Sequence, residues 1–445
     1  MISVYRIVLS FVAFALFLIK GQAVAQQNLT LLQCIEYAVE NNLDIQQARI
    51  TERLSEVDVH QAKFDLFPDL NGTASHNISF GRSVNPITDV IDDQRISAGN
   101  MSVNTSLLLF SGFRQLNAIA QARYNMMANQ SAVEKVKQQV MVNVAATFLQ
   151  VLYSKEQMEA TREQVAISRA QVANAERKVE VGTIPMGDLL QLKATLANDE
   201  LTLTQATNTY EINLLNLKNL LNINPSTPFG IEVPENVDLM LAQIRTDYSL
   251  SEVFTKAVEI NPGMAEAAHR RLAAEENLQI ARGALLPTLS FGAGLGTRYS
   301  NNREFPISDQ LDQNFNQYFG FQLSIPIFNR FQAQNAVKRA RLNLQGAQIT
   351  ENLSRNELNQ TIAQALADLR AAEKNYASAL QAYESSRLAF EYSQKRFDVG
   401  LTNAIDLNLS KTQLAQTEAD MLQSKYDLIF RSKIIDYYLG KSMAF

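Results

Sequence analysis

The chain has 445 residues, enough for two or three domains of ordinary size, and its net charge of −5 at pH 7 argues against a nucleic-acid partner, which would require a basic surface. A single cysteine, Cys34, excludes an intrachain disulfide, and its position in a helical pattern predicts a buried packing residue. The sequence contains no Walker loop, dinucleotide fingerprint or Ser–His–acid arrangement, and its three histidines lie far apart, so we predict no catalytic residue, metal site or cofactor.

Residues 1–25 have the features of a secretory signal peptide. Arg6 precedes an apolar run from Ile7 to Ile19, and Ala23-Val24-Ala25 provides the small residues of a cleavage site. We therefore expect cleavage after Ala25, with an uncleaved membrane anchor as the alternative. No later run reaches the length of about eighteen apolar residues that a transmembrane helix needs. The exported chain is thus expected in the periplasm, outside the cell or in the outer membrane.

The sequence after the signal peptide is duplicated. Leu31 recurs as Leu250 at an offset of 219 residues, and Gly182 recurs as Gly400 at an offset of 218. Many other positions match at the same two offsets, so a single deletion separates the two copies. The duplication predicts two structural repeats and a linker that closes the first one: 26–247, 248–445 and, within the first, the linker 223–247.

Each repeat is expected to begin with two helices. Their predicted ranges are 31–41 and 43–65 in the first repeat, and 250–260 and 262–284 in the second. Thr30 and Ser249 stand where a side chain caps the first helix of each pair. Pro68 and Pro287 end the second helix, because proline cannot donate a backbone hydrogen bond inside a helix.

An alternation of apolar and polar residues then predicts two strands in each repeat. Their ranges are 70–80 and 100–110, followed by 289–299 and 318–328, with polar loops at 81–98 and 300–315. In the last strand Phe319, Phe321 and Leu323 share one face, while Gly320 and Gln322 share the other. Each strand has about eleven residues, the length that a tilted membrane strand needs.

A long helix follows each strand pair. The predicted ranges are 113–180 and 331–397, and each long helix is followed by a reversal and a returning helix, at 188–222 and 405–440. Apolar residues recur at coiled-coil spacing along both long helices, so we expect antiparallel coiled-coil pairs. Helices of this length reach roughly 100 Å, too long for a compact globule.

The strands impose a requirement on assembly. A strand in lipid must have all its backbone groups paired, so only a closed barrel can span a membrane, and the smallest such barrels have about eight strands. One chain supplies four strands, two chains would supply eight and three would supply twelve, and the periodicity alone leaves these last two possibilities open.

The duplicated strand pair, the turns Phe-Ser-Gly-Phe at 110–113 and Phe-Asn-Arg-Phe at 328–331, and the Val-Gly reversals resemble the TolC family of outer-membrane efflux proteins. The resemblance covers about residues 28–440. It implies a mostly α chain with a small β part, whose homotrimer shares a twelve-stranded barrel in outer-membrane lipid and a periplasmic α-helical tunnel.

The resemblance also implies a function. The trimer would be a passive duct that extends from the outer membrane into the periplasm and serves a tripartite efflux or type I secretion system. Its partners would be a periplasmic adaptor and an inner-membrane pump, which choose the cargo, so drug, metal and protein export stay open. The alternative is a periplasmic coiled-coil scaffold without a membrane barrel, which leaves the four strands unexplained.

The family also suggests site residues. The periplasmic turns would contact the adaptor through Val181, Gly182, Thr183, Val399, Gly400 and Leu401. The alternative is that these residues only form tight helix turns. A constriction of the tunnel would involve Asp188, Asp406 and Leu409, where Leu409 replaces a second acidic residue of the family pattern. The alternative for the carboxylates is stabilisation by the helix dipole alone.

Two further positions depart from the family pattern at this constriction. Thr402 and Phe397 stand where the family supplies Arg and Tyr to a hydrogen-bond network that closes the tunnel. A hydrophobic constriction is therefore the alternative to a gate held by salt bridges.

Overall fold

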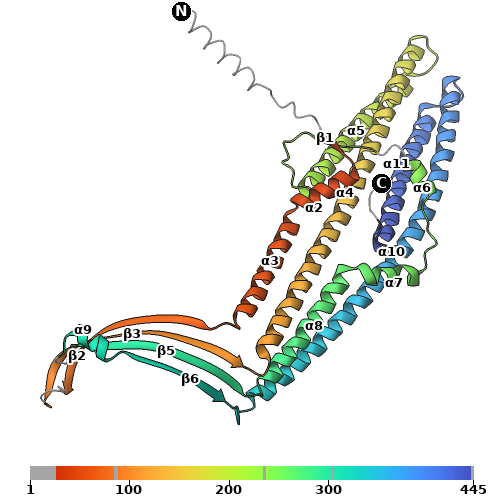
Figure 1. Ribbon diagram of the computed structural model, residues 1–445. Helices are drawn as coiled ribbons and strands as arrows, with labels where there is room; N and C mark the ends of the chain where they lie inside the picture. Colours follow the sequence, from red (N-terminus) through yellow and green to blue (C-terminus); the bar gives the residue numbers. More distant parts are fainter. Residues whose placement is uncertain (1–26, 85–88, 234–236, 302–304, 442–445) are drawn as a thin grey trace, which may run out of the picture. The chain divides into compact units, whose positions relative to one another are not determined.

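The computed structural model describes residues 27–84, 89–233, 237–301 and 305–441; the predicted signal peptide lies outside them. The chain divides into two compact units, each containing segments of both sequence repeats (Figure 1). We call them the helical unit (Met1–Gln46, Lys135–Asn261 and Glu357–Phe445) and the strand unit (Gln47–Glu134 and Pro262–Asn356).

The helices follow the same order in both repeats. In the first repeat they are α2 (Leu31–Asn41), α3 (Leu43–Phe64), α4 (Arg114–Glu180) and α5 (Met186–Leu220), and in the second α7 (Leu250–Ile260), α8 (Pro262–Gly283), α10 (Gln332–Asp398) and α11 (Ala404–Tyr438). These bounds confirm the predicted helices to within a few residues. None of the described helices has both the length and the hydrophobicity needed to cross a membrane.

The predicted N-terminal caps are confirmed. At α2 the backbone N–H of Gln33 donates to Thr30 Oγ1 over 3.3 Å, and the N–H of Thr30 donates to Gln33 Oε1 over 3.0 Å. This reciprocal pair is a capping box. At α7 the N–H of Glu252 donates to Ser249 Oγ over 3.2 Å. Both helices therefore begin where a short polar side chain satisfies a free backbone donor.

The strand unit contains one antiparallel sheet, in the order β2-β3-β5-β6. Its strands are β2 (Asp69–Val84), β3 (Ile91–Phe110), β5 (Thr288–Ser300) and β6 (Asn316–Ser324). In the middle of the sheet Leu107 pairs with Phe291, and Phe291 pairs with Phe321, whose ring centroid lies 5.3 Å from that of Phe291. Residues that pair directly point to the same face, so these three form an apolar row across three strands.

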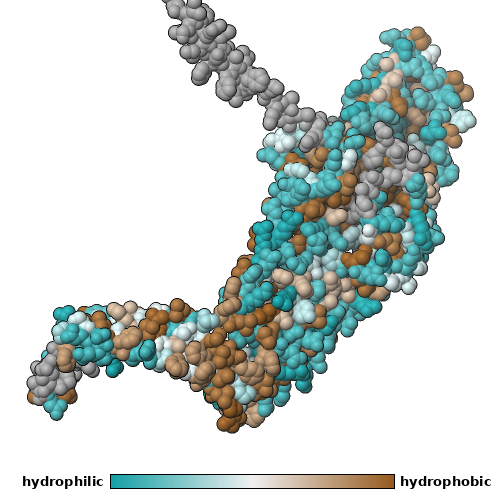
Figure 2. Space-filling view, in the orientation of Figure 1, coloured by the Kyte–Doolittle hydropathy of each residue, from teal (hydrophilic) through white to brown (hydrophobic). Residues whose placement is uncertain are grey.

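The two faces of the sheet differ in polarity. The apolar face carries Leu70, Val103, Met101, Leu107, Leu289, Leu295, Phe291, Phe319, Phe321 and Leu323. The opposite face carries Asn71, Thr73, Ser75, Asn100, Ser102, Asn104, Tyr318 and Gly320. Most of the large apolar side chains of the sheet are exposed in the single chain. Figure 2 shows hydrophobic residues gathered where the strands of this unit meet its helices.

Several strand bounds differ from the prediction. Most of the loop predicted at 81–98 is strand, because β2 and β3 pair as far as Val84 and Ile91. The strand predicted at 318–328 ends at Ser324, so residues 325–328 were wrongly assigned. Ser324 pairs with Thr288, the first residue of β5, and therefore no partner strand extends beyond it. Pro326 also lacks the backbone donor that a further ladder bond would use.

The loop predicted at 300–315 contains a short helix, α9 (Ile307–Gln313), packed beside the end of β5. The buried Gln310 fixes it: the backbone N–H of Ser300 donates to Gln310 Oε1 over 2.8 Å, and Gln310 Nε2 donates to the Phe305 carbonyl over 2.7 Å. Because β6 pairs with β5 only as far as Gly296, α9 covers strand edge that would otherwise be open.

The turns from strand to long helix use the left-handed backbone region. Gly112 and Phe113 have φ of 65°, and at the equivalent turn Arg330 and Phe331 have φ of 55° and 60°. The ring of Phe113 meets that of Phe110 edge to face at 5.4 Å, and Phe331 meets Phe328 in the same way at 5.6 Å. The two turns that carried the family resemblance thus share one conformation and one aromatic pair.

The core of the helical unit lies among α2, the first turn of α3, α4, α5 and α11. Its largest fully buried side chains include Ile45, Phe148, Leu152, Leu217 and Leu221. Cys34 is also fully buried there, as predicted, and burial raises the pKa of its thiol to about 12. A short parallel pair, β1 (Gln27–Leu29) with β4 (Phe229–Ile231), brings the start of the described chain against the linker.

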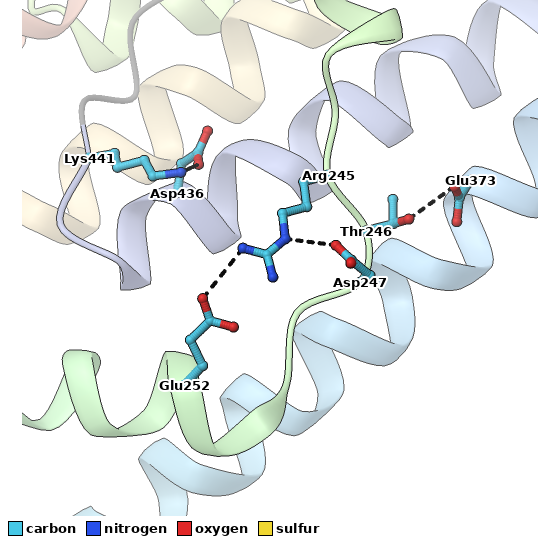
Figure 3. Close-up of polar contacts among 7 residues, drawn as sticks. All are labelled: Arg245, Thr246, Asp247, Glu252, Glu373, Asp436 and Lys441. Atoms are coloured by element: carbon cyan, nitrogen blue, oxygen red, sulfur yellow. Dashed lines mark hydrogen bonds and ion pairs between the residues drawn. The ribbon is translucent and has the colours of Figure 1, made fainter.

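The linker predicted at 223–247 contains β4 and a short helix, α6 (Val237–Ala242), and polar contacts hold its end (Figure 3). Arg245 donates from Nε to Asp247 Oδ1 over 2.7 Å and from Nη1 to Glu252 Oε1 over 3.4 Å. Thr246 Oγ1 donates to Glu373 Oε1 of α10 over 3.0 Å. The Arg245 guanidinium also lowers the pKa of Asp247. The linker is therefore attached to α7 and α10.

Candidate functional site

Both helix reversals end in the same hydrogen-bonded turn. After α4, the N–H of Gly182 donates to the Val179 carbonyl over 3.0 Å, and the N–H of Thr183 donates to the Lys178 carbonyl over 2.8 Å. Gly182 has a φ of 71°. This is a Schellman motif, in which a left-handed residue satisfies the last free carbonyls of a helix. A glycine adopts this backbone conformation without strain.

The turn after α10 repeats this geometry. The N–H of Gly400 donates to the Phe397 carbonyl over 3.1 Å, and the N–H of Leu401 donates to the Arg396 carbonyl over 2.8 Å, with a φ of 78° at Gly400. We call these two turns, 181–183 and 399–401, the tips. A Cβ built on Gly182 or Gly400 would meet no other atom within 4 Å. The glycines are thus required by the backbone and not by crowding.

Large apolar side chains surround the two tip glycines and face outward. Val181 keeps 74% of its surface exposed, and Leu401 keeps 70%. Others near the turns are also exposed: Met186, Leu190, Val399, Ile405 and Leu409. Exposed apolar side chains that gather in one region indicate an interaction surface.

A buried apolar cluster joins the two hairpins just behind the tips. It contains Val172 and Ala175 of α4, Leu189 and Leu192 of α5, Phe390 and Phe397 of α10, and Ala404, Leu407 and Leu414 of α11. Because all four helices contribute, the two tips are held together on one packed end. Phe397 is among the buried members, and its side chain has no hydrogen-bond donor or acceptor, so it cannot take part in a hydrogen-bond network.

Lys178 is a tip residue that the sequence analysis did not single out. Its Nζ donates to the Asp398 carbonyl over 3.0 Å, lies 3.5 Å from Asp398 Oδ1, and stands 5.2 Å from the centre of the Phe397 ring. A cation at a helix C-terminus is favourable because the free carbonyls there carry partial negative charge. The signal in the sequence was a pair of basic residues in the last turn of α4, Arg177 and Lys178.

The two predicted carboxylates have different surroundings. The backbone N–H of Asp406 donates to Asn403 Oδ1 over 2.9 Å, and Thr402 Oγ1 donates to Asp406 Oδ2 over 2.9 Å. Asp406 is therefore part of the N-terminal cap of α11 and remains exposed. Asp188 lies in the first turn of α5, where Pro185 precedes the helix without a side-chain cap. Leu409, one turn beyond Asp406, is exposed.

A buried polar network lies deeper in the helical unit and was also missed. Lys411 of α11 contacts Ser168 Oγ of α4 and Asp199 Oδ2 of α5, and the Ser168 hydroxyl donates to Asp199 Oδ2 over 2.5 Å. The Lys411 side chain is only 4% exposed. A buried ammonium needs a partner of this kind, because its desolvation is costly. The three residues lie on three helices, so no local pattern could reveal their contact.

The described residues provide no cluster of three or more His, Cys, Asp or Glu side chains that could hold a metal ion.

Comparisons with known proteins agree with the fold. The sequence model of the outer membrane efflux protein family matches residues 34–222 and again residues 253–440. The chain is 24% identical over 430 residues to the outer membrane efflux protein BepC of Brucella suis biovar 1 (strain 1330), covering 96% of this chain and 88% of BepC.

Solved structures share the fold. The structure of CusC is similar with a TM-score of 0.78 and 18% identity, over 94% of this chain and 96% of CusC. The outer membrane protein VceC of Vibrio cholerae is similar with a TM-score of 0.74 and 17% identity, over 93% of this chain and 96% of VceC. Each of the two family matches contains a long helix, a Val-Gly reversal and a returning helix, and the chain belongs to the outer membrane efflux protein family.

Proposed function

We propose that the chain is one subunit of a passive exit duct, which carries substrates from a periplasmic adaptor and an inner-membrane pump across the outer membrane. The duct itself performs no catalysis. It serves a tripartite efflux or type I secretion system, and the pump supplies the energy. The names of relatives support export: SrpC of Pseudomonas putida is a solvent efflux pump outer membrane protein and is 24% identical over 419 residues.

The observation that carries this proposal is the two-faced sheet of the strand unit. Its apolar face is exposed and its other face is polar, the alternation expected of a strand between lipid and a water-filled lumen. Its outer strands, β2 and β6, have no strand on their far sides among the described residues. In lipid these edges require partners, because unpaired backbone groups each cost several kcal/mol there.

A neighbouring copy of the chain is the natural partner for each edge, with β6 of one copy beside β2 of the next. Two copies would give eight strands and three would give twelve. The family favours three, so we propose a homotrimer with one shared twelve-stranded barrel and a tunnel built from the long helices. We also propose that the two repeats arose by duplication, which the double match of the family supports.

We propose that the tips of the helical unit dock the adaptor. Val181, Gly182 and Thr183 would form one contact, and Val399, Gly400 and Leu401 the other. Their exposed apolar side chains and tight turns support this assignment. A helical hairpin of the adaptor could pack against such a surface without displacing any side chain of the core.

Asp188, Asp406 and Leu409 would narrow the tunnel near this end. The Phe397 side chain has no hydrogen-bond donor or acceptor, and Thr402 donates to Asp406 within its own turn. These two residues therefore do not support a gate held by hydrogen bonds. We propose instead that exposed apolar side chains such as Leu409 form the constriction in the trimer, while the ring of Asp406 carboxylates favours cations at the entrance.

Fractionation of cells that express the full chain tests the proposal. An exit duct is expected in outer membranes, as an oligomer that survives mild detergent and dissociates on heating. A soluble periplasmic chain would refute the proposal and favour the scaffold alternative. Cross-linking of the oligomer then counts its subunits, and any number other than three would overturn the proposed trimer.

A further inference from the structure

A groove of about 590 Å³ lies in the helical unit, away from the tips. Residues of α4, α10 and α11 line it, and all of these lining residues belong to the helical unit. Its volume is in the range of sites that hold drug-sized molecules. The strand face, the tips and the buried Lys411 network have no part in its lining.

Aromatic and apolar side chains form part of the lining of the groove. Tyr153 of α4 and Tyr426 and Phe430 of α11 line it, beside the buried Leu149. The Tyr426 hydroxyl donates to Glu156 Oε1 over 2.5 Å, which fixes the ring. Burial raises the pKa of the Tyr153 phenol, and the nearby negative charge of Asp420 raises it further. Tyr153 is therefore an uncharged phenol at physiological pH.

The lining of the groove also includes two carboxylates, Asp420 and Asp427. Asp427 is paired, since Arg431 Nε lies 3.1 Å from Asp427 Oδ1, and Arg431 Nη1 lies 2.7 Å from Asp368 Oδ2. Asp420 accepts a hydrogen bond from Gln416 Nε2 over 2.9 Å at one carboxylate oxygen. The ion pairs found among the described residues do not include Asp420. None of the described side chains that line the groove is Lys, Arg or His.

Asp420, which forms none of the ion pairs found among the described residues, lies close to the neutral ring of Tyr153, and this combination favours a cationic ligand. The ring faces carry partial negative charge and attract a cation that is large and weakly hydrated, as in the recognition of quaternary ammonium groups. An anion would meet the Asp420 charge, and a small hydrated metal ion would gain little from the apolar lining. The groove therefore suits a molecule that combines a positive charge with apolar groups.

We propose that this groove is a binding subsite for hydrophobic organic cations in the wall of the duct. This inference rests on the proposed function, because a transit site has a purpose only in a channel through which such molecules pass. Conduction requires binding that is favourable enough for entry and weak enough for release. The subsite would therefore hold its ligand transiently.

Binding of ethidium to the purified oligomer in detergent tests the subsite, because ethidium fluorescence increases when the dye leaves water. Saturable binding is expected, and tetraphenylphosphonium should displace the dye, whereas the neutral triphenylphosphine oxide should not. Asp420→Asn and Tyr153→Leu should each weaken binding by about fivefold to tenfold, as loss of a charge or an aromatic contact predicts. Glu36→Gln removes the same charge from an exposed position on α2 and should leave binding unchanged.

Two results would overturn the subsite: no saturable binding by the wild-type oligomer, or equal binding by the wild-type and Asp420→Asn oligomers. The first result is also expected if a neighbouring copy covers the groove. Both are distinguishable from failure of the proposed function, which would appear beforehand as absence of the oligomer from outer membranes. A folding defect is controlled by comparing the heat dissociation of each variant oligomer with that of the wild type.

Discussion

Replacing Asp199 with alanine is expected to destabilise the helical unit strongly, because it removes the only carboxylate in the Ser168–Asp199–Lys411 network. The Lys411 side chain is 4% exposed and the Asp199 side chain is 22% exposed. In Asp199→Ala the ammonium group of Lys411 keeps the Ser168 hydroxyl as a partner but loses its counter-charge. It cannot reach solvent without disturbing the packing of α4, α5 and α11.

The magnitude follows from the burial of the pair. Removing one partner of a buried ion pair costs about 3–5 kcal/mol, since the other charge is left without compensation. Because water reaches part of Asp199, we expect the lower end of that range, about 3 kcal/mol. For a chain of this length each kcal/mol shifts the unfolding midpoint by about 1 °C, so the variant should melt about 3 °C lower.

Thermal unfolding of the detergent-solubilised oligomer, followed by far-UV circular dichroism, measures this shift. The double variant Asp199→Leu with Lys411→Met is the matched control, because it removes both charges and keeps apolar volume. Its midpoint should return to the wild-type value or exceed it. If Asp199→Ala melts like the wild type, the network does not contribute as argued. If the double variant is no better than the single one, the charge imbalance is not the cause.

Three further perturbations test other parts of the structure. Gly400→Arg should lower the free energy of unfolding by about 1 kcal/mol, because arginine is strained in the left-handed backbone region, but its Cβ meets no neighbouring atom. The variant should therefore still form the oligomer in the outer membrane while losing export. Phe321→Arg should cost about 2–4 kcal/mol in the membrane and lower the yield of heat-sensitive oligomer, whereas Gln322→Arg on the polar face should be tolerated. The pKa of Glu418 is raised, chiefly by burial and secondly by the nearby charge of Glu163. Protonated Glu418 therefore stabilises the folded state, and this stabilisation is lost as the pH rises through the folded-state pKa. Glu418→Gln should therefore raise the melting midpoint at neutral pH and leave it unchanged at about pH 4, below the unfolded-state pKa.

Each of these outcomes has a control. Gly400→Ala has the same backbone cost without bulk or charge, so export by this variant, combined with loss of export in Gly400→Arg, assigns the effect to the docking contact. Loss of the oligomer in Gly400→Arg would instead mean that the glycine serves only the fold. Equal assembly of Phe321→Arg and Gln322→Arg would contradict the assignment of faces. A melting midpoint for Glu418→Gln that equals the wild-type value at neutral pH would contradict the burial argument.

The sequence by itself determined the features that depend on neighbouring residues. Thr30 and Ser249 specify helix starts because a cap bonds to a backbone group three residues away. Gly182 and Gly400 specify helix ends because only the local backbone decides whether a left-handed residue is strained. The period of two in the strands likewise predicted which side chains share a face, since that alternation is a property of the strand itself.

Only the tertiary structure decided the features that depend on distant partners. Residues 325–328 continue the apolar alternation, yet β6 ends at Ser324 because the strand beside it begins at Thr288. Asp199 contacts Ser168, which is 31 positions away in the sequence, and Lys411, which is 212 positions away. No pattern in the neighbouring sequence predicts these contacts. A local pattern fixes the conformation of a segment, but strand length and the burial of a charge are set by what the fold places beside that segment, and this depends on the whole chain.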